Sequence, residues 1–145
     1  PFLGTCGGYQ HAILEYARNV LGLADAANAE IDPNASLPLI APLSCALIDQ
    51  DGGIDLLENS LIRDVCGTAH LTETYRCSFG FNPAYADLLD GRDLRIVAWD
   101  QDRDPRAVEL RGHPFFIGTA FQPERAALRG EDHPLINAFV RAAAG

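Results

Sequence analysis

The sequence predicts a single α/β domain whose mostly parallel sheet contains a small antiparallel patch. Two observations predict this class. Apolar runs of strand length alternate along the chain with amphipathic segments of helical period. Near the middle, two strand-like runs at 94–99 and 107–110 are separated only by the turn at 100–105, which predicts a local antiparallel pair. With 145 residues, the chain is long enough for one domain with its own core.

The first half of the chain begins with an apolar run that reads as a core strand and leads into a predicted helix over 10–21. The small, alanine-rich stretch at 23–29 is interpreted as a short helical turn. Residues 39–48 alternate weakly and contain Pro42, which favours an edge strand because proline cannot donate to a ladder. The acidic, glycine-containing stretch at 49–53 is typical of a hairpin tip.

The second half of the chain alternates more clearly. Helices are predicted at 60–65, at 83–90 and at 134–143, with strands at 71–81 and 114–121. Ser60 and Asp132 are the predicted caps of the first and the last of these helices, and Asn82-Pro83 begins the middle one. In the last helix we expect the apolar residues to face inward, namely Leu135, Phe139 and Val140.

Composition and charge narrow the classes of partner. The apolar fraction of 48% is ordinary for a globular protein, and no run approaches the length of a membrane span. A net charge of -9 with a pI near 4.7 repels phosphate, so neither nucleic acid nor a membrane surface is an expected partner. The chain opens at Pro1, inside the first predicted strand, so we expect the N-terminal part of this domain to be missing from residues 1–145.

The cysteines and histidines do not have the spacing of metal sites. The sequence holds four cysteines without a C-x-x-C pair and four dispersed histidines without an H-E-x-x-H pattern. Because neither a disulfide framework nor a zinc site is indicated, and no leader is visible, a reducing cytoplasm is the expected location. No metal and no cofactor are expected. The cysteines are Cys6, Cys45, Cys66 and Cys77.

The segment that carries chemistry is the glycine-framed cysteine at residues 4–8. Gly4-Thr5-Cys6-Gly7-Gly8 has the form of a strand-to-helix elbow with cysteine in the nucleophile position. The start of the following helix directs free N–H groups and its positive end at the sulfur, which favours thiolate over thiol. The competing interpretation of Cys6 is a small apolar residue buried in a glycine-rich turn.

Beyond the elbow, several segments in the same order resemble class I glutamine amidotransferase domains of the CTP synthase type. They are Leu3–Gln10, Glu15–Val20, Asn28–Glu30, His113–Phe116, Phe121–Glu124 and His133–Leu135. The resemblance implies a flavodoxin-like three-layer sandwich. It also implies hydrolysis of glutamine to glutamate and ammonia, with the ammonia passed to a synthase active site. A small amide such as glutamine is therefore the expected ligand, and the candidate partners are a synthase domain or subunit, together with further copies of the chain.

The resemblance assigns roles to individual residues. Cys6 matches the nucleophile and Glu124 the carboxylate of the catalytic triad. Gln10 and Glu30 match positions that hold the substrate, with Glu30 expected to pair with its ammonium group. The N–H of Gly7 is the expected oxyanion donor.

Two departures from the family pattern affect the chemistry. The family's Phe-His-Pro-Glu reads Phe121-Gln122-Pro123-Glu124 here, so Gln122 stands at the general-base position. A glutamine amide cannot take a proton from a thiol at neutral pH. The family's Arg-Tyr pair, which grips the substrate carboxylate, aligns with Ser78 and Phe79, so a charge-assisted contact is lost.

Three interpretations follow. The domain is an enzyme with altered chemistry that uses another base, or a noncatalytic module that binds a small ligand or regulates a synthase, or a glutaminase in which another group replaces the base weakly. His11, five residues after Cys6, is one candidate base. We expect His113 to be structural at a strand start, and His70 and His133 to lie at the surface or in a cap.

Overall fold

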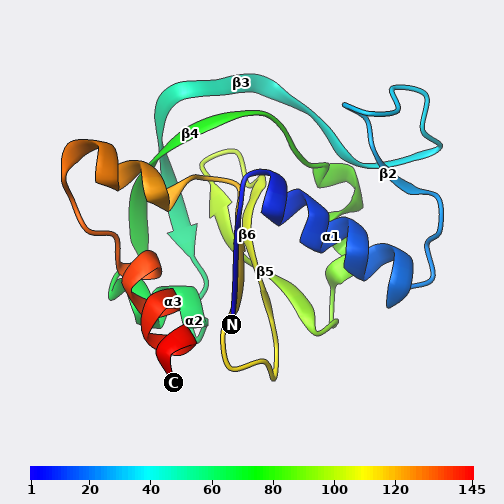
Figure 1. Cartoon of the computed structure of the whole chain (residues 1–145). Coiled ribbons are helices and arrows are strands. Elements are labelled where there is room, and N and C mark those ends of the chain that lie inside the picture. The colour runs from blue at the N-terminus through cyan, green and yellow to red at the C-terminus, as the bar shows by residue number, and fades with distance from the viewer.

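The computed structural model describes the backbone of residues 1–145 and the side chains of residues 1–43 and 48–145. Strands and helices are interspersed along the chain, and some strands follow one another without a helix between them (Figure 1). The elements are β1 (Phe2–Thr5), α1 (Gly7–Asn19), β2 (Ala26–Asn28), β3 (Leu37–Leu56), α2 (Leu61–Cys66), β4 (His70–Phe81), the 3₁₀ helix η1 (Pro83–Leu89), β5 (Leu94–Asp100), β6 (Pro105–Leu110), β7 (Phe116–Thr119), the 3₁₀ helix η2 (Pro123–Arg129) and α3 (Pro134–Ala144).

The described strands form one seven-stranded sheet in the order β1-β7-β6-β5-β3-β2, with β4 paired to β3 outside this path. β1 lies parallel to β7, and Thr5 is in register with Thr119. β2 is parallel to β3. The pairs β3–β4, β3–β5, β5–β6 and β6–β7 are antiparallel.

The α/β class is confirmed, but the sheet is mixed with mainly antiparallel pairs, whereas the sequence predicts a mostly parallel one. The reason lies in the connections. The turns at 100–105 and 110–116 are too short for the crossover that a parallel pair requires, so β5, β6 and β7 run back and forth. The predicted pairing of 94–99 with 107–110 is confirmed.

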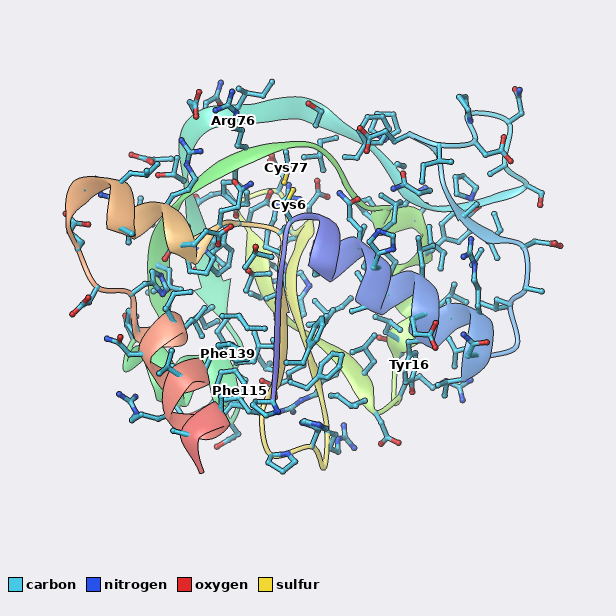
Figure 2. All side chains as sticks on the ribbon, viewed as in Figure 1. Cys6, Tyr16, Arg76, Cys77, Phe115 and Phe139 are labelled. Atoms are coloured by element: carbon cyan, nitrogen blue, oxygen red, sulfur yellow. The ribbon has the colours of Figure 1, made fainter. Side chains whose placement is uncertain are left out.

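Helices cover both faces of the sheet, which gives three layers (Figure 1). On one face, Tyr9 of α1, which is 1% exposed, packs against Gly118 of β7. On the other face, Phe115 contacts Phe139 of α3, with ring centroids 6.0 Å apart (Figure 2). The two faces therefore bury separate apolar layers against one sheet.

The strands β3 and β4 form a long two-stranded arm that arches over the N-terminal end of α1 (Figure 1). The sequence predicts only an edge strand at 39–48 and a hairpin tip at 49–53. In the structure β3 continues through both, with register shifts after Pro42 and near Asp49, where φ is 51°. Pairing with β4 extends the strand past these irregularities, because bulges absorb residues that a regular ladder excludes.

Smaller differences concern single elements. The stretch interpreted as a helical turn at 23–29 contains β2 instead, because Ala26 and Asn28 pair with β3. The predicted cap of α2 by Ser60 is confirmed, since its side chain accepts from the N–H of Arg63. In α3 the cap is His133 and not Asp132, and Val140 is 58% exposed and does not face inward.

Candidate active site at the elbow cysteine

Cys6 occupies a strained backbone position between β1 and α1. Its φ of 49° and ψ of -103° lie outside the regions that a side chain tolerates easily. The Cys6 N–H donates to the carbonyl of Thr119 at 2.8 Å, which extends the β1–β7 ladder to the turn. The neighbouring strand therefore holds the strained turn in place.

Of the three glycines that frame the elbow, Gly4 is the one that the turn requires. A Cβ on Gly4 would lie 2.8 Å from the backbone carbon of Gly8 and 2.5 Å from the ring of Phe2. A Cβ on Gly7 or Gly8 would meet nothing within 4 Å. The close approach of strand and helix thus depends on Gly4, whereas the other two positions have space for a side chain.

The sulfur of Cys6 lies 2.6 Å from the sulfur of Cys77, which belongs to β4 (Figure 2). Cys77 is 6% exposed, and its thiol also points at the carbonyl of Ala120, 3.3 Å away. The arm therefore places a second thiol directly against the elbow. The single proton of the Cys77 thiol can be donated to the carbonyl of Ala120 or to the sulfur of Cys6. An ionised Cys6 is the stronger acceptor because it carries a negative charge.

These contacts lower the pKa of the Cys6 thiol to about 7. The largest cause is the hydrogen bond with Cys77. Partial burial and the charges of Glu124 and Glu30 oppose the shift, and the N–H of Gly7 adds to it. The pKa of Cys77 is raised in turn, mainly by the same hydrogen bond and by burial. The favoured ionised state is a Cys6 thiolate next to a protonated Cys77.

A cavity of about 280 Å³ opens beside the sulfur of Cys6. Five further residues predicted from the sequence line it together with Cys6, namely Gly7, Gln10, Glu30, Ser78 and Phe79. Arg76 and Cys77 complete the lining. The elbow, the turn after β2 and the strand β4 thus meet at one place, although they are far apart in the sequence.

Within this wall, Gln10 is a structural bridge. It is 8% exposed, its amide nitrogen donates to the carbonyl of Phe79 at 3.1 Å, and its oxygen accepts from Asn28 at 3.3 Å. Asn28 in turn accepts from the N–H of Glu30. Gln10 therefore connects α1 to β4 and to the turn that carries Glu30, and its polar groups already have partners.

Gln122 and Glu124, predicted at the triad positions, do not line this cavity. Glu124 accepts a hydrogen bond from the hydroxyl of Thr5 at 2.9 Å and borders a separate cavity with His133. Gln122 occupies the N-cap position of η2 without a capping bond from its side chain, and its side-chain oxygen is buried without a hydrogen-bond partner among the described residues. Glu124 lies close enough to Cys6 for its charge to act on the thiol, but no imidazole of the described chain stands between them.

Among the side chains that the structure describes, no histidine is hydrogen-bonded to Cys6. His11, the predicted candidate base, lines a different cavity of about 400 Å³ with Phe2 and Tyr16. The other three have structural partners, as expected. His113 accepts from the N–H of Phe115, His70 contacts Asp55, and His133 caps α3 and contacts Glu73 at 2.7 Å. Of these, His133 is buried and not a surface residue.

Cys77 and Arg76, which also line the cavity, were not predicted from the sequence. Phe79 is predicted there, and residues at intervals of two share a face of a strand, so Cys77 could have been placed from Phe79 by this period. Arg76 could have been placed in the same way from Ser78, which was also predicted there and lies two residues further along the strand. It brings a positive charge to a wall from which the family's arginine is absent at Ser78.

The described residues contain neither a candidate metal site nor a membrane-spanning helix. Within residues 1–43 and 48–145, no three His, Cys, Asp or Glu groups gather where they could hold a metal ion. No described helix has the length and apolar character needed to cross a bilayer.

The sequence of the chain is similar to sequences of known CTP synthases. No family model matches the chain. It is 37% identical over 154 residues to the CTP synthase of Caldivirga maquilingensis and 35% identical over 155 residues to that of Methanopyrus kandleri. These alignments cover 99% and 100% of the chain, but only 28% and 29% of the relatives.

The fold of the chain is also similar to the folds of solved structures. The glutaminase domain of Trypanosoma brucei CTPS with bound acivicin superposes with a TM-score of 0.85 at 25% identity, over 99% of this chain and 60% of that one. A putative GMP synthase subunit from Thermoplasma acidophilum has the same general fold, with a TM-score of 0.56 at 13% identity, over 86% and 48% of the two chains.

Proposed function

Because this chain belongs to the class I glutamine amidotransferase domains of the CTP synthase type, we propose that Cys6 is a nucleophile toward glutamine-like γ-carboxyl substrates. The observation that carries this proposal is the Cys6 thiol, with its pKa lowered to about 7, at the wall of a cavity that also holds Glu30 and Arg76. A thiolate of this kind attacks without a base to deprotonate it.

The charges of the cavity suit a free amino acid. Glu30 carries a carboxylate that pairs with an α-ammonium group, and Arg76 carries a guanidinium that pairs with an α-carboxylate. A glutamine side chain held between these charges and Cys6 places its carboxamide carbon within reach of the sulfur. In this arrangement Arg76 takes over the role that the family gives to the residue at Ser78.

The first chemical step needs only groups that the elbow supplies. The Cys6 thiolate adds to the carboxyl carbon, and the N–H of Gly7, which stabilises the thiolate at rest, donates to the new oxyanion. Collapse of this intermediate forms a thioester and expels the leaving group. For a substrate whose leaving group departs as an anion, no imidazole is required up to this point.

With glutamine as substrate, expulsion of ammonia and hydrolysis of the thioester both need proton transfer, which Gln122 cannot perform. An amide nitrogen leaves only when it is protonated, and hydrolysis of the thioester needs an activated water. Loss of a triad histidine costs several orders of magnitude in rate. The domain is therefore expected to react well with γ-aryl esters of glutamate, whose leaving group departs as an anion, and slowly with glutamine.

A second candidate function is a noncatalytic module that binds a small amino acid ligand beside a synthase domain. The observation that favours it is the same departure at Gln122, together with the placement of the four histidines, whose contacts lie away from Cys6. In this case the cavity binds without turnover, and glutamine and a synthase domain are the proposed ligand and partner.

A burst experiment separates the two functions. We expect mixing with a γ-nitrophenyl ester of glutamate to release about one equivalent of nitrophenol per domain, followed by slow turnover, because the thioester accumulates. Peptide mapping then finds the glutamyl group on Cys6. L-glutamine, and acivicin, which the Trypanosoma brucei domain binds, should both compete with the burst.

The matched controls are Cys6→Ser and Cys66→Ser, since Cys66 lies at the end of α2 away from the cavity. Only Cys6→Ser should abolish the burst. Protection of Cys6 from iodoacetamide by glutamine, without any burst, supports the binding module. A burst that survives in Cys6→Ser, or acylation spread evenly over the cysteines, contradicts the proposed nucleophile.

A further inference from the structure

We propose that Cys6 and Cys77 form a reversible disulfide, so that the elbow is a site of oxidative modification. The two residues are 71 positions apart in the sequence, yet their sulfurs are 2.6 Å apart. A disulfide bond is about 2.05 Å long, so closing it requires the sulfurs to move together by roughly 0.6 Å. Both thiols are free in the structure.

Backbone hydrogen bonds at both cysteines keep the two sulfurs close together. Cys6 is fixed by its N–H bond to Thr119, and Cys77 sits in the ladder between β3 and β4. Their meeting does not depend on a mobile terminus or on an exposed loop. Because the two sulfurs are already in contact, we expect side-chain rotation to close the bond while both ladders stay intact.

The two thiols differ in the way that thiol–disulfide exchange needs. Cys6 borders the open cavity, so a small oxidant can reach it, whereas Cys77 is buried behind it. The low pKa of Cys6 provides thiolate for the attack on the oxidant. Cys77 then acts as the resolving thiol, because it already contacts the sulfur that becomes activated.

The reaction balances with a low-molecular-weight disulfide such as oxidised glutathione as the oxidant. The Cys6 thiolate attacks one sulfur of that disulfide, forms a mixed disulfide and releases one thiolate. The Cys77 thiol then loses its proton to solvent and attacks the Cys6 sulfur, which releases the second thiolate. The protein loses two electrons and two protons in total, and the small disulfide is reduced to two thiols.

Oxidation would therefore inactivate the Cys6 nucleophile, and reduction would restore it. In the oxidised state the Cys6 sulfur is bonded to Cys77 and is no longer a thiolate, so it does not attack a substrate carbon, and reduction by a small thiol restores the thiolate. This inference concerns the thiols alone, so it holds or fails whether or not the proposed reaction with glutamine-like substrates takes place.

The experiment equilibrates the folded chain in glutathione buffers of increasing oxidation, quenches it with acid, and maps the peptides by mass spectrometry. We expect a cross-linked pair that contains Cys6 and Cys77, lighter than the two thiol peptides by two hydrogen atoms. Blocking of Cys6 toward iodoacetamide should follow the same titration and reverse with dithiothreitol. Cys66→Ser is the matched control and should leave both readouts unchanged.

Two variants make the test sharper. Cys77→Ser lacks the resolving thiol, so Cys6 should stop at the mixed disulfide and carry one glutathionyl group. Cys6→Ser should leave Cys77 unmodified while the chain is folded. Because the wild-type map is decisive alone, a poorly folded variant does not remove the test. A wild-type map in which Cys6 stays reduced, keeps its glutathionyl group or pairs with Cys45 overturns the proposal.

Discussion

The hydroxyl of Thr5 donates to the carboxylate of Glu124 at 2.9 Å, so the residue before the elbow cysteine is tied to the start of η2. The two residues are 119 positions apart in the sequence. Thr5 ends β1, and Glu124 lies in η2, which follows β7, the strand that pairs with β1. The hydrogen bond keeps the carboxylate that is predicted for the triad close to Cys6, although Gln122 stands at the position predicted for the base.

The first prediction follows from that arrangement. Gln122→His puts an imidazole two residues before Glu124, on the segment that the Thr5 bond anchors to the elbow. We expect release of glutamate from glutamine to rise by about 100-fold or more, since a positioned general base contributes about 10²–10⁴-fold. A coupled glutamate assay measures this change.

The matched control for this gain is the double variant Gln122→His with Glu124→Gln, in which the imidazole has no carboxylate to orient it. It should lose most of the gained rate while keeping the burst with the γ-aryl ester. If Gln122→His gains nothing and still binds glutamine, the missing base is not the limiting defect, and the wall around Ser78 becomes the explanation.

The second prediction concerns the acidity of Cys6. Its pKa of about 7 depends first on the hydrogen bond from Cys77, so Cys77→Ala should raise the pKa toward the ordinary thiol value of about 8.5. The rate of iodoacetamide labelling against pH then shifts upward. At pH 7 the rate should fall by about threefold, because the loss of thiolate outweighs the higher nucleophilicity of a more basic sulfur.

Cys66→Ala serves as the control for this titration. Burial raises the pKa of the Cys66 thiol to about 12, so its removal should not change the labelling of the folded chain near neutral pH. An unchanged midpoint in Cys77→Ala would mean that Gly7 and the helix start lower the pKa of Cys6 without help from the second thiol.

The third prediction tests the charge that Arg76 brings to the cavity. Arg76→Ala should weaken the protection of Cys6 by L-glutamine about tenfold or more, since a hydrogen bond to a charged group contributes about 1.5–3 kcal/mol. The labelling rate without ligand should stay unchanged. The exposed Arg141 on α3 provides the comparison, because Arg141→Ala removes the same charge at a distance from the cavity. Equal protection in both variants would remove Arg76 from the binding site.

The fourth prediction concerns the stability of the elbow. Gly4→Ala introduces a methyl group 2.8 Å from the backbone of Gly8, which cannot move without shifting α1. We expect a loss of about 1–3 kcal/mol in the free energy of unfolding, as overpacked sites show. Gly8→Ala has space around it and lies within α1, so it should be neutral or stabilising by up to about 1 kcal/mol. Urea unfolding of the two variants measures the contrast.

The parts of this molecule that local rules control could be predicted from the sequence. The elbow, the helix after it and the capped start of α2 are examples, because a few neighbouring residues determine them. The extent of β3 could not be predicted, since Pro42 and the glycines at 52 and 53 indicate breaks, and only the partner strand β4 shows that the ladder continues. Local signals are weak where strand pairing decides.

The candidate site shows the same division. Most residues that line the cavity were predicted, because their spacing resembles a known family, whereas Arg76 and Cys77 of β4 were not. Cys77 becomes important only through the fold of the arm, and no pattern within residues 70–81 distinguishes a structural thiol from one that contacts another sulfur.

Because Cys77 lies on the β3–β4 arm, the pKa of the Cys6 thiol depends on whether the arm has packed against the elbow. Cys6 and its turn come from the first residues of the chain, while the donor that acidifies it arrives on β4. A chain whose arm has not yet docked carries an ordinary thiol at the elbow. Ultraviolet absorbance of the thiolate near neutral pH would therefore follow the seating of the arm during refolding, without any added dye or label.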